Sequence, residues 1–387
     1  MNYPLARECI APGVHFSSIT DRKFKHNRMS VNLVINLDRD KVTNRAVVPL
    51  ILRQGTKKCP DFTKLNERLC DLYGASLDAG VDKFAEYQII TLGMSGIDNR
   101  YALHGEDMVS ECAGLLAEIL FEPNITDGKF DAQETALEKQ YLLDTINAEI
   151  NDKRSYAMTR CKDIMCADEG CSIKKYGYAE KVEQITPESA AEAYEELLRI
   201  AQVEILFEGC GDPTAAKEIF RKKFEGIQRT PISVASYWGR IELGEVIQAV
   251  ERMDVKQGKL GMGFRVEGVT EYKKMNAERI AVALFGGTAN SLLFKNVREK
   301  MSLCYYCSAG YDRNTGLMMV HSGVEAENIE KTKEAVLQQL QMMQRGEFED
   351  KDITETVMFM KTALKATTDS LGAMDSWYLT QILGGTE

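Results

Sequence analysis

The chain has 387 residues, of which 44% are hydrophobic, and it carries a net charge of −10. This length is sufficient for two hydrophobic cores, at roughly 100 to 200 residues per domain. The acidic balance and the dispersed basic residues argue against binding to a phosphate backbone, so nucleic acid is not an expected partner. No stretch of 18 consecutive apolar residues occurs, and the N-terminal residues lack the order of a signal peptide. We therefore expect a cytoplasmic protein that does not insert into a membrane.

The first part of the chain predicts alternating strands and helices. An apolar, β-branched run at Val31 to Leu37 is typical of a strand. Pro49 predicts that the helix before Gly55 either begins near Asn44 to Val48 or is kinked, because proline is tolerated only near a helix start. After an extended run at Glu86 to Met94, a further helix is indicated by apolar residues with 3.6-residue spacing: Met108, Cys112, Leu115, Leu116 and Ile119.

The middle of the chain predicts a helix, a closing strand and then a linker. The helix around Glu138 to Ile146 is made amphipathic by Phe130, Leu137 and Tyr141, so we interpret Glu138 and Asp144 as solvent-exposed carboxylates. Val203 to Glu208 predicts a strand. An amphipathic helix follows, and periodicity is then lost between Phe224 and Gly244, a segment that contains Pro231. This loss predicts a domain boundary, with domains at 1–228 and 229–387.

The second part of the chain repeats the frame of the first part about 230 residues later. Phe285 to Ala309 and Leu52 to Ala75 share a Gly-Thr pair, a polar turn, a helical pattern that carries Arg and an extended piece that contains Tyr. The second copy is likewise followed by an extended run, Gly316 to Val324, and by a helix with apolar residues on one face: Ile329, Val336, Leu340 and Met343. A period of this length indicates duplicated domains rather than a solenoid. Strands and helices do not alternate as strictly as a doubly wound parallel sheet requires, so an α+β fold is favoured.

The ten cysteines are spread over a large globular sequence, which favours free thiols. Cys161, Cys166 and Cys171 recur every five residues, and on one helix each would be rotated by about 140° from the last. We therefore do not expect them to converge on a metal. Cys304 and Cys307 lie in an extended segment, where positions three apart face opposite sides of the sheet, so a zinc site there is not expected either.

At the two Gly-Thr segments and at the REKMSLCY stretch, the chain resembles the insulinase-like (pitrilysin) family of zinc peptidases. The resemblance implies two tandem homologous halves in a clamshell arrangement, each with a mixed or antiparallel sheet and helices packed on one face. By comparison with the first half, the second half stops about 40 residues short, so the C-terminal domain is expected to be truncated.

Active members of this family carry His-x-x-Glu-His just before the first Gly-Thr. Anchoring on that pair, the resemblance places the two histidines at Ala46 and Leu50, the general base at Pro49 and the downstream glutamate at Thr145. The apolar side chains offer no donor atom, and a Thr hydroxyl is a poor zinc ligand. Only four histidines occur, and no two of them are four residues apart. The metal motif is thus degenerate, and we expect no zinc on this chain and no peptidase activity from it alone.

The resemblance also implies a substrate-binding role for Arg298 and Tyr305. In the family, an Arg and a Tyr seven residues apart bind the peptide carbonyl opposite the zinc, and here Ser302 replaces the glycine of that pattern. A guanidinium and a phenol can stabilise a developing oxyanion without a metal. The structural alternative is a surface ion pair of Arg298 with Glu299 or a neighbour, with Tyr305 filling the sheet.

Some two-domain bacterial members work as heterodimers, in which one subunit carries zinc and the other carries the Arg and Tyr. The chain resembles the second kind, found in Gram-positive bacteria, so its expected partners are a zinc-bearing homologous subunit and a peptide substrate. Two alternatives remain: a structural or assembly protein derived from the same fold, and a peptidase with unrecognised ligands.

Overall fold

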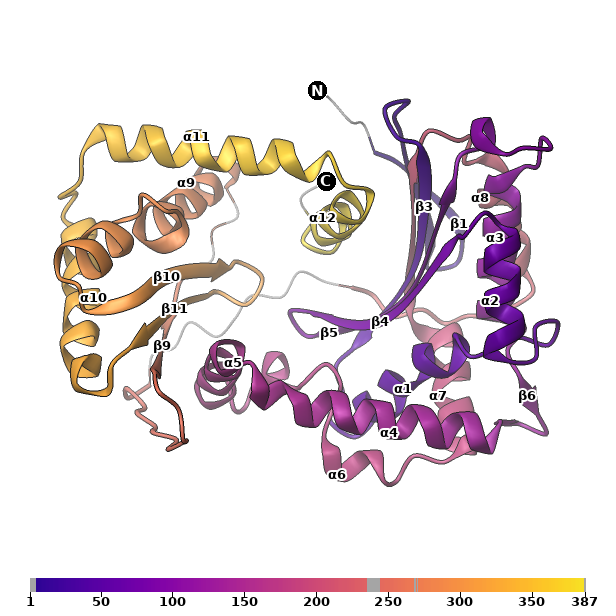
Figure 1. Cartoon of the computed structure of the whole chain (residues 1–387), viewed down its shortest axis with the longest axis horizontal. Coiled ribbons are helices and arrows are strands. Elements are labelled where there is room, and N and C mark those ends of the chain that lie inside the picture. The colour runs from indigo at the N-terminus through magenta and orange to yellow at the C-terminus, as the bar shows by residue number, and fades with distance from the viewer. Residues whose placement is uncertain (1–4, 235–243, 268, 270, 386–387) are drawn as a thin grey trace. The chain divides into compact units, whose positions relative to one another are not determined.

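A computed structural model describes residues 5–234, 244–267, 269 and 271–385. The described residues form two compact units, each assembled from separate stretches of the chain (Figure 1). The first unit draws on Met1–Asn147, Ile173–Ser236 and Thr367–Glu387. The second draws on Ala148–Ser172 and Tyr237–Ala366. The expected boundary between residues 228 and 229 divides the sequence into homologous halves, whereas these units are defined in space, so the boundary stays a prediction. Part of the expected linker, 235–243, lies outside the described residues.

The first unit contains a six-stranded mixed sheet in the order β1-β2-β8-β3-β5-β4. Strands β2 and β8 are parallel, and the other neighbours are antiparallel. The strands are β1 (Ala6–Ala11), β2 (Val14–Thr20), β3 (His26–Asn36), β4 (Ser76–Phe84), β5 (Tyr87–Ile97) and β8 (Gln202–Gly209). A short hairpin, β6 (Ile125–Thr126) and β7 (Lys129–Phe130), forms a separate pair.

Alternation along β3 separates the two faces of this sheet. Met29, Val31, Leu33 and Ile35 point into the main core, which they share with most of the helices of the unit. The opposite face of β3 carries Arg28, Ser30 and Asn32, and the C-terminal helix packs there against β8 and β3. The helices are α1 (Val42–Leu52), α2 (Phe62–Asp71), α3 (Met108–Phe121), α4 (Ala132–Ala148), α6 (Ala179–Val182), α7 (Pro187–Ile200), α8 (Thr214–Glu225) and α12 (Leu371–Leu383), with a 3₁₀ turn η1 (Asn99–Tyr101).

The second unit is built on a three-stranded antiparallel sheet in the order β10-β11-β9. Its strands are β9 (Gly258–Arg265), β10 (Cys304–Asp312) and β11 (Leu317–Val324). One face of the sheet packs into a core that includes Met318, Val320 and Val336. The remaining elements are α5 (Lys153–Met165), α9 (Tyr272–Val282), the π-helical turns η4 (Ala283–Gly287) and η5 (Leu293–Lys300), α10 (Ile329–Gln344) and α11 (Asp350–Thr367), with 3₁₀ turns η2 (Glu149–Asn151), η3 (Gly170–Ser172) and η6 (Ala326–Asn328).

Two glycines allow α5 to lie close to the other face of this sheet. A Cβ on Gly263 would lie 2.4 Å from the Met165 sulfur, and a Cβ on Gly261 would lie 3.2 Å from Cβ of Cys161. A larger residue at Gly263 would therefore displace the Met165 side chain at the end of α5. The sheet thus carries helices on both faces, with the principal core on one of them.

The two units confirm the prediction of two homologous α+β halves, because they share one connectivity. In the first unit β3 is followed by α1, α2, β4, β5 and α3, and in the second β9 is followed by α9, η5, β10, β11 and α10. The sheet orders also match, as β3-β5-β4 and β9-β11-β10. Gly55 and Gly287 both follow the first helix of their half and both precede a threonine.

Each unit also receives a helix from the other half of the chain. Helix α5 comes from the first half of the sequence and belongs to the second unit, whereas α12 comes from the second half and belongs to the first unit. The long helices α4 and α11 lead into these two exchanged helices. Periodicity along the chain carries no information on which sheet a helix covers, so this exchange was not predicted.

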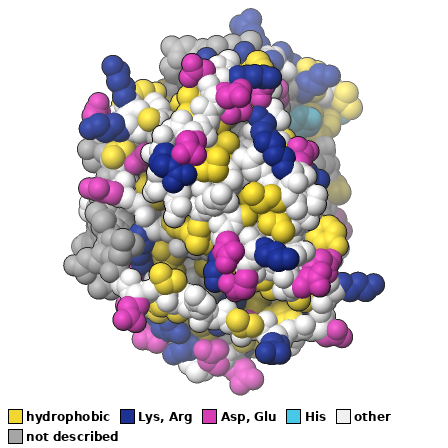
Figure 2. All heavy atoms as spheres, turned by 90° about the vertical axis from the view of Figure 1, so that its left-hand side faces the viewer, with side chains coloured by type: hydrophobic (Ala, Val, Ile, Leu, Met, Phe, Trp, Pro, Cys, Tyr) yellow, Lys and Arg dark blue, Asp and Glu magenta, His cyan; other side chains and the backbone are white. Residues whose placement is uncertain are grey.

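Charged side chains of both signs are interspersed on the face that Figure 2 presents. Among the described helices, none combines the length and the apolar character that a membrane-spanning helix needs.

Candidate functional site

Helix α1 carries the positions that the resemblance assigns to zinc ligands and to the general base. Ten of its eleven residues are buried, and Ala46 has an exposed fraction of 0%. Pro49 lies inside the helix, which begins at Val42, so the expected start near residues 44–48 is wrong, and the alternative of a kinked helix stays a prediction. An interior proline costs about 3 kcal/mol, and we attribute its tolerance here to the burial of the surrounding apolar residues. The side chains of Ala46, Pro49 and Leu50 are core, and they do not fit a metal ion.

The fourth vacated position, Thr145, lies on α4, and its hydroxyl donates to the backbone carbonyl of Tyr141 at 2.8 Å. The same helix corrects one interpretation from the sequence. Glu138 is only 2% exposed and accepts a hydrogen bond from Gln54, whereas Leu137 and Tyr141 are exposed. The buried residues of α4 are Thr135, Glu138 and Leu142, so the helix turns Glu138 inward and its larger apolar side chains outward. The interpretation of Asp144 as an exposed carboxylate is confirmed.

Burial raises the pKa of Glu138, and the charge of Arg53 and the hydrogen bond from Gln54 oppose that effect. Both partners come directly before Gly55, in the turn that ends α1. The cluster therefore joins this turn to α4. A glutamine and an arginine beside the Gly-Thr pair were the signal in the sequence that could have predicted a buried acidic partner.

Arg298 lies on η5, and its guanidinium carbon is 4.4 Å from the ring centroid of Phe294. The expected alternative, an ion pair with Glu299 or a neighbour, is not among the contacts that the described residues make. The charge of Arg298 acts on Cys304, at the start of β10. The Arg298 side chain thus lies beside the segment that carries Tyr305.

Tyr305 is 58% exposed on the edge strand β10, and its hydroxyl donates a hydrogen bond to the carboxylate of Glu325. This carboxylate raises the pKa of the Tyr305 hydroxyl. A tyrosine that filled the sheet would be buried, so this structural alternative is wrong for Tyr305. Its substrate-binding role stays a prediction.

Ser302 adopts the left-handed conformation, with φ of 51°, in the turn that joins η5 to β10. Left-handed backbone favours glycine, the residue that the family pattern has at this position. Ser302 thus adopts the left-handed conformation that a glycine would favour, in the turn between Arg298 and Tyr305.

The expectation that Cys304 and Cys307 face opposite sides of the sheet is wrong. Strand β10 has an irregularity in register between Cys304 and Tyr306. Cys304 pairs with Val324 and Cys307 pairs with Ser322, and these two partners are two residues apart on β11. Residues two apart on a strand share a face, so the bulge at Tyr305 brings both cysteines to the same side.

The expectation that Cys161, Cys166 and Cys171 do not converge is wrong for the last two, because α5 ends at Met165 and Cys171 lies in the 3₁₀ turn η3. Cys161 is not part of the group. Donor atoms of Cys166, Glu169 and Cys171 lie within 4.8 Å of one another. Two sulfurs and a carboxylate suit zinc by type. However, the guanidinium of Arg265 forms an ion pair with Glu169, and the hydrogen bond to Cys171 together with burial raises the pKa of Cys166. We interpret the cluster as a structural contact between α5 and β9.

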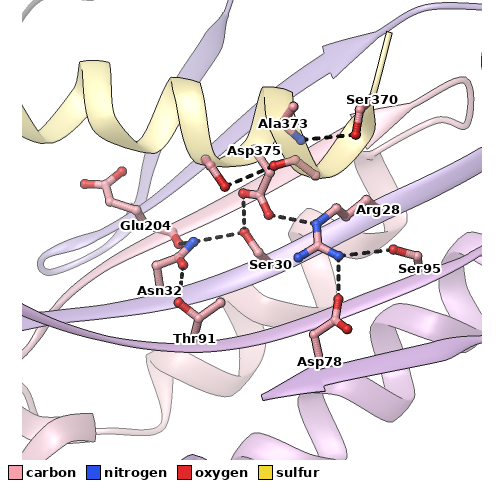
Figure 3. Close-up of polar contacts among 12 residues, drawn as sticks. Arg28, Ser30, Asn32, Asp78, Thr91, Ser95, Glu204, Ser370, Ala373 and Asp375 are labelled. Atoms are coloured by element: carbon pink, nitrogen blue, oxygen red, sulfur yellow. Dashed lines mark hydrogen bonds and ion pairs between the residues drawn. The ribbon is translucent and has the colours of Figure 1, made fainter. Parts of the chain in front are cut away.

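A polar network on the second face of the first sheet holds α12 (Figure 3). Asp375 accepts from Arg28 Nε at 2.8 Å and from the Ser30 hydroxyl at 2.7 Å. Arg28 also pairs with Asp78 at 2.7 Å. Burial and the charge of Asp375 raise the pKa of the neighbouring Glu208 well above its ordinary value, against the opposing charge of Arg28. Asp375, the one charged residue of α12, was a signal in the sequence for this network.

Comparisons with known proteins agree with this architecture. Residues 184–359 match a family model described as the peptidase M16 inactive domain. The chain is 30% identical over 369 residues to a probable inactive metalloprotease, YmfF, of Bacillus subtilis strain 168, which covers 95% of this chain and 86% of that protein.

Solved structures give the same result for the fold. A conserved protein from Enterococcus faecalis V583 is 26% identical, with a TM-score of 0.89, over 99% of this chain and 90% of that one. A peptidase M16 inactive domain from Pseudomonas fluorescens is 15% identical, with a TM-score of 0.75, over 99% and 89%. The chain therefore belongs to the insulinase-like (M16) family of metallopeptidases.

Proposed function

We propose that this chain is the non-catalytic, substrate-binding subunit of a heterodimeric metallopeptidase. In this proposal a homologous partner chain carries zinc, and Arg298 and Tyr305 bind the peptide carbonyl near the scissile bond. The observation that carries the proposal is the contrast in burial between the vacated metal positions and Tyr305. Ala46, Pro49 and Leu50 are packed in the core, whereas Tyr305 keeps a hydroxyl donor at the surface.

The position of Tyr305 is compatible with a peptide substrate. Strand β10 is an edge of its sheet, and an edge strand offers unpaired backbone groups to an extended peptide. To reach the substrate, the Tyr305 hydroxyl must exchange its hydrogen bond with Glu325 for one with the carbonyl. The phenol and the guanidinium then stabilise negative charge on that oxygen as the partner's zinc chemistry proceeds.

The test is the turnover of the reconstituted pair of subunits with Arg298→Ala or Tyr305→Phe in this chain. We expect kcat to fall about 10²- to 10³-fold for the loss of one such donor, with little change in melting temperature. Matched controls are Arg345→Ala and Tyr272→Phe, at exposed positions of the same unit, which should leave kcat unchanged.

The same preparation separates the two alternatives. We expect the isolated chain to hold well below one zinc per molecule by elemental analysis and to cleave no peptide. Stoichiometric zinc with chelator-sensitive hydrolysis would favour a peptidase with unrecognised ligands. Unchanged turnover in both variants of the reconstituted pair would favour a structural or assembly protein.

A further inference from the structure

Cys304 and Cys307 are neighbours on the core-facing side of the second sheet, although they are three positions apart in the sequence. The bulge at Tyr305 brings them to one face of β10, and both pack against the core of the second unit. Cys307 is buried and Cys304 is half-buried. Their strand partners on β11, Val324 and Ser322, are two residues apart, so the two thiols lie on adjacent positions of one face.

The surroundings of the pair favour a thiolate on one of the two sulfurs. The hydrogen bond from Cys307 lowers the pKa of Cys304 to about 7, against the opposing effect of burial, and Ser322 and the charge of Arg298 act in the same direction. The Cys307 thiol keeps its proton, because its hydrogen bond to Cys304 and its burial raise its own pKa. A thiolate is the reactive form of cysteine.

A second pair of cysteines in the same unit shows the opposite properties. Cys166 and Cys171 are close together, but both are buried, and the pKa of Cys166 is raised. The two cysteines are therefore close together in both pairs. Cys304 differs from Cys166 because it is partly exposed and its pKa is lowered. This difference provides an internal control for reactivity.

We propose that Cys304 and Cys307 form an oxidation-sensitive dithiol, in which Cys304 is the nucleophile and Cys307 is the resolving thiol. The oxidant is a hydroperoxide such as hydrogen peroxide. The Cys304 thiolate attacks one peroxide oxygen, the O–O bond breaks, and Cys304 becomes a sulfenic acid while hydroxide leaves. The Cys307 sulfur then attacks Cys304, a disulfide forms, and the sulfenic hydroxyl leaves with the Cys307 proton as water.

Closing this disulfide would constrain the segment that contains Tyr305. A regular strand spans roughly 10 Å over three residues, whereas the Cα atoms of a disulfide lie within about 7 Å of each other. The bulge at Tyr305 already shortens this span, so a disulfide would fix the bulged form of β10. If the proposed function holds, oxidation should restrict the movement of Tyr305 from Glu325 to the substrate carbonyl.

The test uses the isolated chain and needs no peptidase partner. Reduced protein is alkylated with iodoacetamide between pH 5 and 9, and each cysteine is followed by peptide mass spectrometry. We expect half-maximal alkylation of Cys304 near pH 7, at a rate at pH 7 about threefold to tenfold above that of an ordinary exposed thiol. Cys70, which is exposed, provides the reference, and Cys166 should stay unmodified in folded protein.

Hydrogen peroxide then tests the second step. We expect a peptide linked by Cys304 and Cys307 that is lighter by two hydrogens, and in Cys307→Ser a sulfenic acid at Cys304 that dimedone traps. Oxidation of Cys304 no faster than that of Cys70, or a disulfide at Cys166 and Cys171 instead, would overturn the proposal. The alkylation profile of the unmodified sequence decides the matter if Cys307→Ser does not fold. A failure of the subunit proposal would leave these thiol measurements unchanged.

Discussion

The two regions that carry the family's chemistry differ in burial. On α1, in the first unit, the positions of the metal ligands are filled by apolar side chains of the core. On η5 and β10, in the second unit, Arg298 and Tyr305 keep their polar groups available, and Tyr305 is exposed. The first region now contributes to stability, whereas truncation of Tyr305 would cost little stability. Substitutions in each region test this contrast.

The largest effect on stability is expected from restoring histidines at Ala46 and Leu50. Ala46 has no exposed surface, so an imidazole there must overpack the core and bury unpaired nitrogen atoms. We expect the double variant to lose about 3 to 6 kcal/mol in urea unfolding, the sum of two such changes. It should bind no stoichiometric zinc, because Thr145 cannot complete the site.

Asn44→His is the matched control on the same helix, since Asn44 is the only residue of α1 that is not buried. It should change the free energy of unfolding by less than about 1 kcal/mol. A double variant as stable as the parent, holding one zinc per chain, would show that the metal site is latent rather than replaced by core.

Much of the framework could be predicted from the sequence, because it is encoded locally. The apolar spacing from Met108 to Ile119 predicted α3, and the repeated Gly-Thr frame predicted two homologous halves. The vacated metal motif could also be identified, because it depends on residue types at fixed spacing. Each of these inferences concerns residues that are close in sequence or that repeat.

The remainder depends on contacts between distant segments or on local irregularities. The packing of α12 against β3 joins residues about 345 positions apart, and no periodicity in α12 indicates its partner. The bulge at Tyr305 reversed the inference about Cys304 and Cys307, since one inserted residue changes which side chains share a face. Glu138 was misassigned because a carboxylate was assumed to be solvated, whereas Gln54 supplies its hydrogen bond.

The next largest effect should come from the charged network under α12. Arg28→Met would leave Asp375 and Glu208 buried without a cation, and removal of one partner of a buried pair typically costs about 3 to 5 kcal/mol. Glu208→Gln should have the opposite sign. Glu208 is 1% exposed, and its Oε2 has no hydrogen-bond partner among the described residues. Removal of its charge should stabilise the protein by about 1 to 3 kcal/mol at pH 8.

The pH dependence gives the sign of the Glu208 effect. Its pKa is raised above the ordinary value of 4.5, so the folded state binds the proton more tightly than the unfolded state does. The contribution of Glu208 to stability is therefore fully present below about pH 4.5, and it is lost as pH rises through the raised pKa. The gain from Glu208→Gln should vanish near pH 4 and grow toward pH 8 in urea unfolding series. A gain that is independent of pH would contradict burial of an ionisable carboxylate.

The smallest effect is expected in the turn before Tyr305. The corresponding turn of the first unit, between α2 and β4, contains Tyr73 at φ of 58° and Gly74 at φ of 73°, whereas the second unit has Ser302 at φ of 51°. Ser302→Gly removes the strain of a left-handed L-residue, about 1 to 2 kcal/mol, but increases the entropy of the unfolded chain by roughly 0.5 to 1 kcal/mol. We expect a net gain near 0.5 kcal/mol in urea unfolding.

Ser302→Ala is the matched control for this turn. It keeps the left-handed strain and removes the weak hydrogen bond from the Ser302 hydroxyl to the Glu299 carbonyl, so stability should fall slightly. Because both variants keep the spacing of Arg298 and Tyr305, neither should alter kcat of the reconstituted pair of subunits by more than about twofold, a factor that corresponds to less than 1 kcal/mol. A large loss of kcat in Ser302→Gly without a loss of stability would mean that serine itself, and not only the shape of the turn, takes part in substrate binding.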